Sequence, residues 1–202
     1  MRKILLLLAT LFFIFGCGSD DSSKPYKIAK FKPFGENEEI VLKGVSGKEL
    51  VLVRKNGGFV LKGAEDKILM LDIFGTFCPP CQKEAPNIMQ YQIDNADKFV
   101  LVALTHFENV TDEYVQNEFV QKYNAFYFIT NNQEINDRIA EQIVKDIDYK
   151  REIALPFKVV LKNGEYQVLT DIDTGKFGVK YYLGGIDMTK MQNDLKRVYG
   201  LK

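Results

Sequence analysis

The chain of 202 residues is long enough to bury one sizeable core, since 46% of its residues are hydrophobic and 15 are phenylalanine. Its 27 basic and 27 acidic residues give a formal net charge of zero, which argues against nucleic acid as a partner because nucleic-acid binding needs a surplus of positive charge. The sequence has no internal repeat and no second long apolar span after its N-terminal one. We therefore expect one domain with an N-terminal appendage.

The N-terminus has the pattern of an export signal. The basic pair Arg2-Lys3 precedes an apolar run over 4–15, which is shorter than the ~20 residues of a membrane span and matches a signal-peptide core. The small polar residues at 18–23 are typical of a flexible tether. We expect a signal peptide at residues 1–16 and a tether at 17–33.

Cys17 closes this signal. The segment Ile14-Phe15-Gly16-Cys17 resembles a bacterial lipobox, in which the cysteine is acylated and becomes the first residue of a mature lipoprotein, although Phe15 is bulkier than the motif normally allows. The resemblance implies that Cys17 anchors the chain to a lipid bilayer. An incidental cysteine in the signal is the alternative. Lipidation also explains the odd number of cysteines, since it leaves Cys78 and Cys81 as one pair of thiols.

Residues 34–66 have the pattern of β-strands, interrupted at 44–47 and at Asn56-Gly57. Asn-Gly between two apolar runs is a strong signal for a two-residue hairpin, here between 50–53 and 59–61. We predict an added N-terminal β-hairpin rather than a second domain.

The pattern of a βαβ unit follows. Ile68–Phe74 and Phe99–Thr105 are near-continuous apolar runs, as in strands that are buried on both faces of a parallel sheet. A helix over 81–97 is expected to cross between them. The domain at 67–202 is thus predicted to be α/β.

Turn signals and periodicity predict the remaining elements. Thr111 has the side chain of a helix N-cap, and isoleucines four residues apart indicate another helix. In chain order the elements are a helix with Val115, Phe119 and Tyr123, a strand at 126–129, a helix with Ile135, Ile139, Ile143 and Ile147, a hairpin of 157–161 with 166–171 around Asn163-Gly164, and a helix capped by Asp187 with Met188, Met191, Leu195 and Val198.

The most informative motif is Cys78-Pro79-Pro80-Cys81, which stands between the strand Ile68–Phe74 and the predicted helix. A cysteine in the first turn of a helix lies near unpaired backbone N–H groups and the positive end of the helix dipole, so Cys78 should lose its proton easily. We therefore assign Cys78 as the nucleophile and Cys81 as the resolving thiol of a redox dithiol. Pro79 and Pro80 stiffen the loop where the helix needs no N–H donors.

Two other readings of the cysteines stay open. A structural zinc site requires four ligands, whereas only Cys78, Cys81 and His106 are at hand. A buried inert pair leaves the position of the motif at a strand-helix junction unexplained. His106 follows a strand whose end should open on the same edge of the sheet as Cys78, so it is either a neighbour of the dithiol or a loop histidine without a role.

These motifs resemble the thioredoxin superfamily. Asp72 stands six residues before Cys78, Pro86 stands eight residues after it, and Pro156 precedes the turn at Asn163-Gly164 with the family's spacing. The resemblance implies a thioredoxin fold, in which a central mixed sheet is flanked by helices. It also implies a cis peptide bond before Pro156, beside the dithiol.

The length of chain between Cys78 and Pro156 leaves room for a helix-strand insert, as in the extracytoplasmic, membrane-anchored TlpA and ResA group. In that group a functional glutamate stands three residues after the second cysteine, where this chain has Glu84. Two positions depart from the family pattern, since Phe77 replaces the usual tryptophan and Leu155 replaces threonine or valine. Both departures bear on substrate preference.

The resemblance also assigns roles to residues. An acid in an apolar strand should have a raised pKa when it is buried, and the resemblance implies that Asp72 accepts the Cys81 proton during resolution; an aspartate at an exposed strand edge is the alternative. Glu84 lies one helical turn past Cys81 and either tunes the thiols or binds substrate, or else is solvated surface. Substrate contacts are expected at Phe77, Pro79, Pro80, Leu155 and Pro156.

The function that the resemblance implies is thiol-disulfide oxidation and reduction in the bacterial envelope, facing the periplasm or the cell exterior. Its direction would be reduction of exported proteins, such as the Cys-x-x-Cys-His site of apocytochrome c, with electrons from a membrane thiol transporter of the DsbD or CcdA kind. No cofactor other than the dithiol is expected. A dithiol oxidase or isomerase would use the same residues at a higher potential, and a Cu(I) chaperone with Cys78, Cys81 and His106 as ligands is the alternative from another class.

Overall fold

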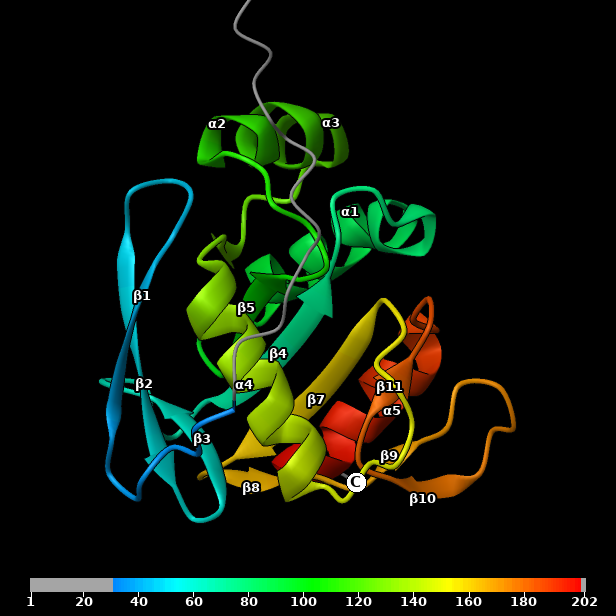
Figure 1. Ribbon diagram of the computed structural model, residues 1–202. Helices are drawn as coiled ribbons and strands as arrows, with labels where there is room; N and C mark the ends of the chain where they lie inside the picture. The colour runs from blue at the N-terminus through cyan, green and yellow to red at the C-terminus, as the bar shows by residue number, and fades with distance from the viewer. Residues whose placement is uncertain (1–30, 201–202) are drawn as a thin grey trace, which may run out of the picture.

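The computed structural model describes residues 31–200. The predicted signal peptide, the proposed lipidation site Cys17 and the tether up to residue 30 lie outside the described residues. A six-stranded sheet forms the centre of the molecule (Figure 1). In spatial order its strands are β11 (Tyr182–Leu183), β7 (Phe157–Lys162), β4 (Ile68–Phe74), β5 (Phe99–Thr105) and β6 (Phe128–Thr130), with β8 (Glu165–Tyr166) paired to β7. Within residues 31–200, no helix combines the length and the apolar character that a membrane span needs.

The predicted βαβ unit is present. β4 and β5 run parallel, from Ile68 opposite Phe99 to Phe74 opposite Thr105, and α1 (Pro79–Asp94) connects them. β7 runs antiparallel to β4 on its other side. The sheet is therefore mixed, as the resemblance predicts.

The side chains of β4 divide the core into two layers. Met70 and Phe74 pack on the face that α1 and α5 (Met188–Tyr199) cover, together with the two cysteines of the Cys-x-x-Cys motif. The alternate residues of β4 pack on the opposite face, under α4 (Gln133–Asp146), which lies in front of the sheet in Figure 1. Because side chains alternate along a strand, Asp72 shares the α1 face with Met70 and Phe74.

The N-terminal extension is a three-stranded antiparallel sheet of β1 (Glu39–Lys43), β2 (Glu49–Lys55) and β3 (Gly58–Leu61). The predicted hairpin is its β2-β3 half, whose turn holds Asn56 and Gly57 at positive φ values of 52° and 80°. The apolar side chains of this sheet pack with those of α4 against the central sheet. The extension thus covers the face opposite to the Cys-x-x-Cys motif.

The insert between β5 and β7 begins with one continuous helical segment whose middle part is a π-helix. Its parts are α2 (Asp112–Val115), η1 (Gln116–Val120) and α3 (Gln121–Tyr123). Thr111 is the N-cap, as predicted, and its hydroxyl accepts the N–H of Tyr114 at 3.1 Å. The strand expected at 126–129 begins later, because pairing with β5 starts where Phe128 meets Val102.

The chain after β7 departs from the predicted hairpin. Only β8 pairs with β7 around Asn163-Gly164, and the rest of the expected strand forms β9 (Leu169–Thr170), which pairs with β10 (Phe177–Val179) in a separate two-stranded sheet. The sequence pattern does not predict β10 and β11, which have three and two residues. Asp187 caps α5 as predicted.

Candidate active site

Cys78 and Cys81 form a disulfide at the N-terminus of α1. Cys78 is the N-cap residue, and its Sγ accepts the backbone N–H of Cys81 at 3.4 Å. Pro79 and Pro80 occupy the first helical positions, where a missing N–H costs the helix no hydrogen bond. In the reduced protein this cap geometry offers a helix N–H donor to a thiolate at Cys78, which favours its ionised form.

A shallow apolar cleft of about 350 Å³ opens over Cys78. Of the two cysteines, Cys78 is the one that lines the cleft, so an incoming sulfur atom meets it first. Phe77 and Phe107 expose 57% and 38% of their surface there, and exposed apolar side chains that gather in one place mark interaction sites. The lining residues are Phe77, Cys78, Pro79, Pro80, Phe107, Ile153, Ala154 and Leu155.

The cleft brings together four of the five residues predicted to contact substrate. The fifth, Pro156, is buried and is not among the lining residues. The Leu155–Pro156 peptide bond is cis, as the resemblance predicts. Phe107 was not predicted as a site residue, although it stands two residues after the end of β5, the strand parallel to β4, and residues that follow parallel strands gather at this edge of the sheet.

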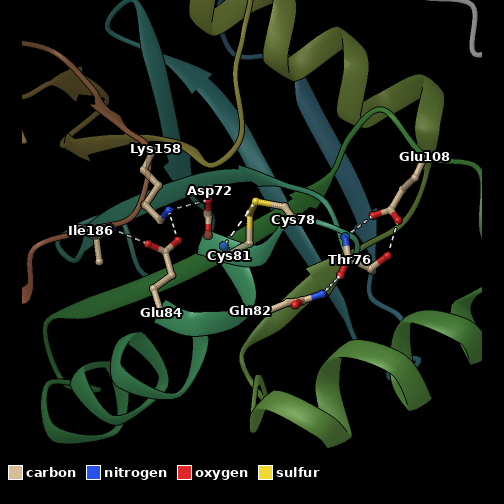
Figure 2. The surroundings of a disulfide bond; sticks show 9 residues. All are labelled: Asp72, Thr76, Cys78, Cys81, Gln82, Glu84, Glu108, Lys158 and Ile186. Atoms are coloured by element: carbon tan, nitrogen blue, oxygen red, sulfur yellow. Dashed lines mark hydrogen bonds and ion pairs between the residues drawn. A yellow bond between two sulfur atoms is a disulfide. The ribbon is translucent and has the colours of Figure 1, made fainter.

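Three buried ionisable side chains lie behind the disulfide (Figure 2). Lys158 on β7 contacts Glu84 on α1, and its Nζ lies 3.3 Å from Asp72 Oδ1 on β4. Glu84 also accepts the backbone N–H of Ile186 at 2.7 Å. The Asp72 and Glu84 side chains are 3% and 6% exposed. The exposed-edge alternative for Asp72 and the solvated-surface alternative for Glu84 are therefore wrong.

The environment of Asp72 favours its protonated form. Burial raises the pKa of Asp72 to about 7, and the Glu84 carboxylate adds to this rise while the Lys158 ammonium opposes it. The contact with Lys158 is an ion pair that falls short of hydrogen-bond geometry, so Asp72 Oδ1 has no hydrogen-bond partner among the described residues. A buried carboxylate oxygen without a donor is poorly stabilised and takes up a proton readily.

Lys158 keeps its charge in this apolar setting. Burial alone would lower the pKa of Lys158, but the carboxylates of Asp72 and Glu84 outweigh that effect and raise it. Lys158 was not predicted as a site residue. Its only signal in the sequence is a lysine inside the apolar strand 157–161, where a buried cation requires a partner.

A second polar network holds the loop before Cys78 (Figure 2). Glu108 accepts the backbone N–H of Thr76 at 2.8 Å and also its hydroxyl, and the Gln82 side chain donates to the Thr76 carbonyl at 2.7 Å. Burial raises the pKa of Glu108, against the two hydrogen bonds from Thr76. The network ties the segments that follow β4 and β5 to α1 and so helps to fix where Cys78 is presented. Neither Thr76 nor Glu108 is predictable, because each is an ordinary polar loop residue.

His106 lies at the predicted edge of the sheet with contacts of its own. Its Nδ1 is 2.8 Å from Asp137 Oδ1, its backbone N–H donates to the Phe74 carbonyl, and its ring lies 4.0 Å from that of Phe107 between centroids. Within residues 31–200, no group of three or more His, Cys, Asp or Glu side chains is placed to hold a metal ion. The zinc and copper hypotheses, which need both cysteines and His106 together, gain no support from this geometry.

Comparison with solved structures identifies the fold. The thioredoxin domain of a thiol-disulfide oxidoreductase from Bacteroides vulgatus matches with a TM-score of 0.51 and 11% identity, over 83% of this chain and 98% of that one. A secreted Mycobacterium tuberculosis disulfide oxidoreductase homologous to E. coli DsbE matches with a TM-score of 0.51 and 16% identity, over 78% and 95%. A thioredoxin family thiol:disulfide interchange protein from Chlorobium tepidum matches with a TM-score of 0.50 and 18% identity, over 84% and 98%. No protein-family model and no curated protein matches the sequence.

These likenesses define the class of protein. The chain has the thioredoxin fold, with a Cys-x-x-Cys disulfide at the N-terminus of α1, which confirms the α/β fold predicted from the motifs. At identities of 11% to 18% the likeness shows the fold alone. The case for an activity therefore rests on the residues of this chain.

Proposed function

We propose that this protein is a thiol-disulfide oxidoreductase that acts on the cysteines of other proteins. The observation that carries the proposal is the Cys78–Cys81 disulfide across the first turn of α1, with Cys78 lining an apolar cleft. A disulfide at a helix N-terminus and at a binding surface is open to exchange with the thiols of a bound protein.

The reaction in the reducing direction starts at Cys78. Its thiolate attacks one sulfur of a client disulfide, and the other client sulfur leaves with the electron pair as a thiolate. The Cys81 thiol then passes its proton to the Asp72 carboxylate and attacks Cys78 Sγ. The Cys78–Cys81 bond forms, the bond between Cys78 and the client breaks, and the client leaves with a second thiolate. Two electrons have passed to the client, whose thiolates take protons from solvent, and a thiol reductant must reduce the Cys78–Cys81 disulfide again.

The cleft suits an extended client segment with apolar side chains beside its cysteine. Cys78 is only 4% exposed, so the client sulfur must enter the cleft to reach it, which favours flexible or unfolded segments over rigid surfaces. Phe107 has a φ of 61°, a conformation that bulky residues rarely adopt and that is concentrated at functional sites. The Cys-x-x-Cys-His segment of apocytochrome c is one client with the required flexibility.

We place the protein in the cell envelope, exported and lipid-anchored through Cys17. Support comes from the signal pattern of residues 1–16, and one protein of the same fold is described as secreted. Disulfides persist in that compartment, where a reductase has substrates. A membrane thiol transporter of the DsbD or CcdA kind would return electrons to the Cys78–Cys81 disulfide.

Trapping of mixed disulfides tests the proposal. In Cys81→Ser the resolving thiol is gone, so clients should stay bound to Cys78 and appear as conjugates on non-reducing gels of cell extracts, from which mass spectrometry identifies them. The matched control is Cys78→Ser, which keeps Cys81 and should trap far less. Equal trapping by both variants, together with no reduction of a disulfide-bonded peptide by the unmodified protein, would contradict the proposal. Titration of the disulfide against glutathione distinguishes a reductase from an oxidase or isomerase.

A further inference from the structure

A second pocket continues the cleft at Cys78 along one side. Its volume is about 530 Å³, and it shares Phe107 and Ile153 with the cleft. The segment 150–155 forms a wall of both cavities, since its first four residues line the second pocket and its last three line the cleft. A client segment that lies over Cys78 therefore has the second pocket directly beside it.

The wall segment 150–155 offers unpaired backbone groups to a client. None of its N–H or C=O groups has a backbone hydrogen-bond partner among the described residues, and an extended peptide that lies alongside can supply such partners. Six residues span at most about 20 Å. A client side chain that enters the second pocket therefore stands within about five residues of the client cysteine.

The second pocket differs from the cleft because charged side chains line it. Glu141 on α4 is half-buried at one wall, and Glu152 is exposed at another. Neither side chain has a hydrogen bond or an ion pair with another described residue. On the same face of α4, one helical turn before Glu141, Asp137 contacts His106, which also lines the pocket. The pocket thus presents two carboxylates that a bound cation can pair with.

The cations at the pocket already have partners within the protein. Lys150 forms an ion pair with Asp148, and Arg151 donates to the Tyr181 hydroxyl at 3.3 Å. With the aspartates that contact lining residues, four carboxylates stand in or beside the pocket against two cations, and they outnumber the cations even when the lining histidine is charged. Charge complementarity therefore favours a cationic side chain in this pocket.

We propose that the second pocket is a subsite of the client cleft and takes a lysine or arginine side chain of the client. The inference rests on the proposed function, because the client is the segment whose cysteine reacts with Cys78. Glu141 and Glu152 are the residues that set this specificity, since their carboxylates accept hydrogen bonds from the cationic group. Phe107 and Ile153 cover the apolar part of the same side chain. Preferred clients carry a basic residue within about five positions of the reacting cysteine.

Binding of peptides that cannot react tests this inference apart from the chemistry. The probes are fluorescent peptides with serine in place of the reacting cysteine, phenylalanine beside it, and one lysine moved through positions two to five on either side in a Gly-Ser background. Fluorescence anisotropy with the oxidised protein at low salt gives the Kd of each peptide. At one position, lysine should bind about fivefold more tightly than glutamine or glutamate. A diffuse attraction between charges would instead act at every position.

Substitutions in the pocket complete the test. The double variant Glu141→Gln, Glu152→Gln should bring the ratio of Kd values for the glutamine and lysine peptides to about one, and Lys150→Gln should widen this ratio. The matched control Glu165→Gln changes an exposed residue of β8 outside both cavities and should keep the ratio of the unmodified protein.

Four outcomes overturn the inference: equal binding at all lysine positions, tighter binding of glutamate, no measurable binding of any peptide, or a preference that survives in the double variant. Disulfide-bonded peptides of the same series test the proposed function separately. If they are reduced at rates that do not depend on the lysine position, only the subsite is wrong. If none of them is reduced while the serine peptides bind as expected, the proposed function is wrong and the pocket remains a binding site for a basic side chain.

Discussion

Glu84 accepts the backbone N–H of Ile186 at 2.7 Å across 102 positions of the sequence. The contact joins α1, which begins at the disulfide, to the loop between β11 and α5. Because Glu84 also contacts Lys158 on β7, one carboxylate links three distant segments around the site. The polar interior behind the disulfide is therefore a product of the tertiary fold and not of the Cys-x-x-Cys segment alone.

Asp72→Asn should remove a pH dependence of stability. The folded protein holds Asp72 at a pKa of about 7, above the usual value of 3.8, so it binds this proton more tightly than the unfolded chain does. The resulting stabilisation is complete below about pH 4 and is lost as the pH rises to about 7, by roughly 4 kcal/mol at most, since one pKa unit corresponds to ~1.4 kcal/mol.

Urea titrations of the oxidised proteins at several pH values from about 4 to 8 measure this effect as a free energy of unfolding. The difference between the unmodified protein and Asp72→Asn should fall steadily across that range. A difference that stays constant with pH would show that the folded protein does not hold the Asp72 proton tightly.

In the reduced protein, Cys78 should be alkylated before Cys81 and already at mildly acidic pH. The reason is that Cys78 caps α1, where its sulfur receives the Cys81 N–H, and that it lines the cleft. Brief treatment with iodoacetamide at a series of pH values, followed by peptide mass spectrometry, gives the rate at each thiol, and Cys78→Ser and Cys81→Ser serve as single-thiol controls. Faster modification of Cys81 would reverse the assignment of nucleophile and resolving thiol.

The elements with strong local patterns were predictable. β4 and β5 are near-continuous apolar runs, and the N-caps Thr111 and Asp187 have the side chains that helix starts prefer. The strands β10 and β11 were not, because two or three residues with no alternation leave no pattern, and their pairing depends on partners that are distant or irregularly spaced.

The site residues were likewise predictable only where a local sequence pattern marks them. The two cysteines, Asp72 and Glu84 stand at the spacings that the thioredoxin superfamily has, so comparison with its sequence motif identifies them. Lys158 was missed because its contact with Asp72 depends on the register that sets the two residues opposite each other. The sequence of neither strand alone determines the register between strands that are distant in the chain. The Thr76–Glu108 contact was also missed, because its two residues are 32 positions apart and only the tertiary fold brings them together.

Cys17→Ala should release the protein from membranes or leave its signal uncleaved. Cys17 lies outside the described residues, so this prediction rests on the segment Ile14-Phe15-Gly16-Cys17 and the apolar run before it. Cell fractionation and the mass of the mature protein provide the measurement. A variant that fractionates and is processed like the unmodified protein would remove the lipoprotein hypothesis while leaving the dithiol chemistry untouched.

Phe107→Ser should weaken client binding and leave the dithiol chemistry intact. Phe107 lines the cleft and is 38% exposed, so its ring offers apolar surface that a bound peptide would bury. Losing it should raise KM for a disulfide-bonded peptide by about tenfold, whereas the rate with oxidised glutathione should stay within about twofold, since a small substrate buries less surface. The matched control is Phe126→Ser, because Phe126 is 56% exposed and lines a different pocket; it should change neither value. An unchanged KM in Phe107→Ser, or an equal rise in Phe126→Ser, would contradict the assignment of this cleft as the client site.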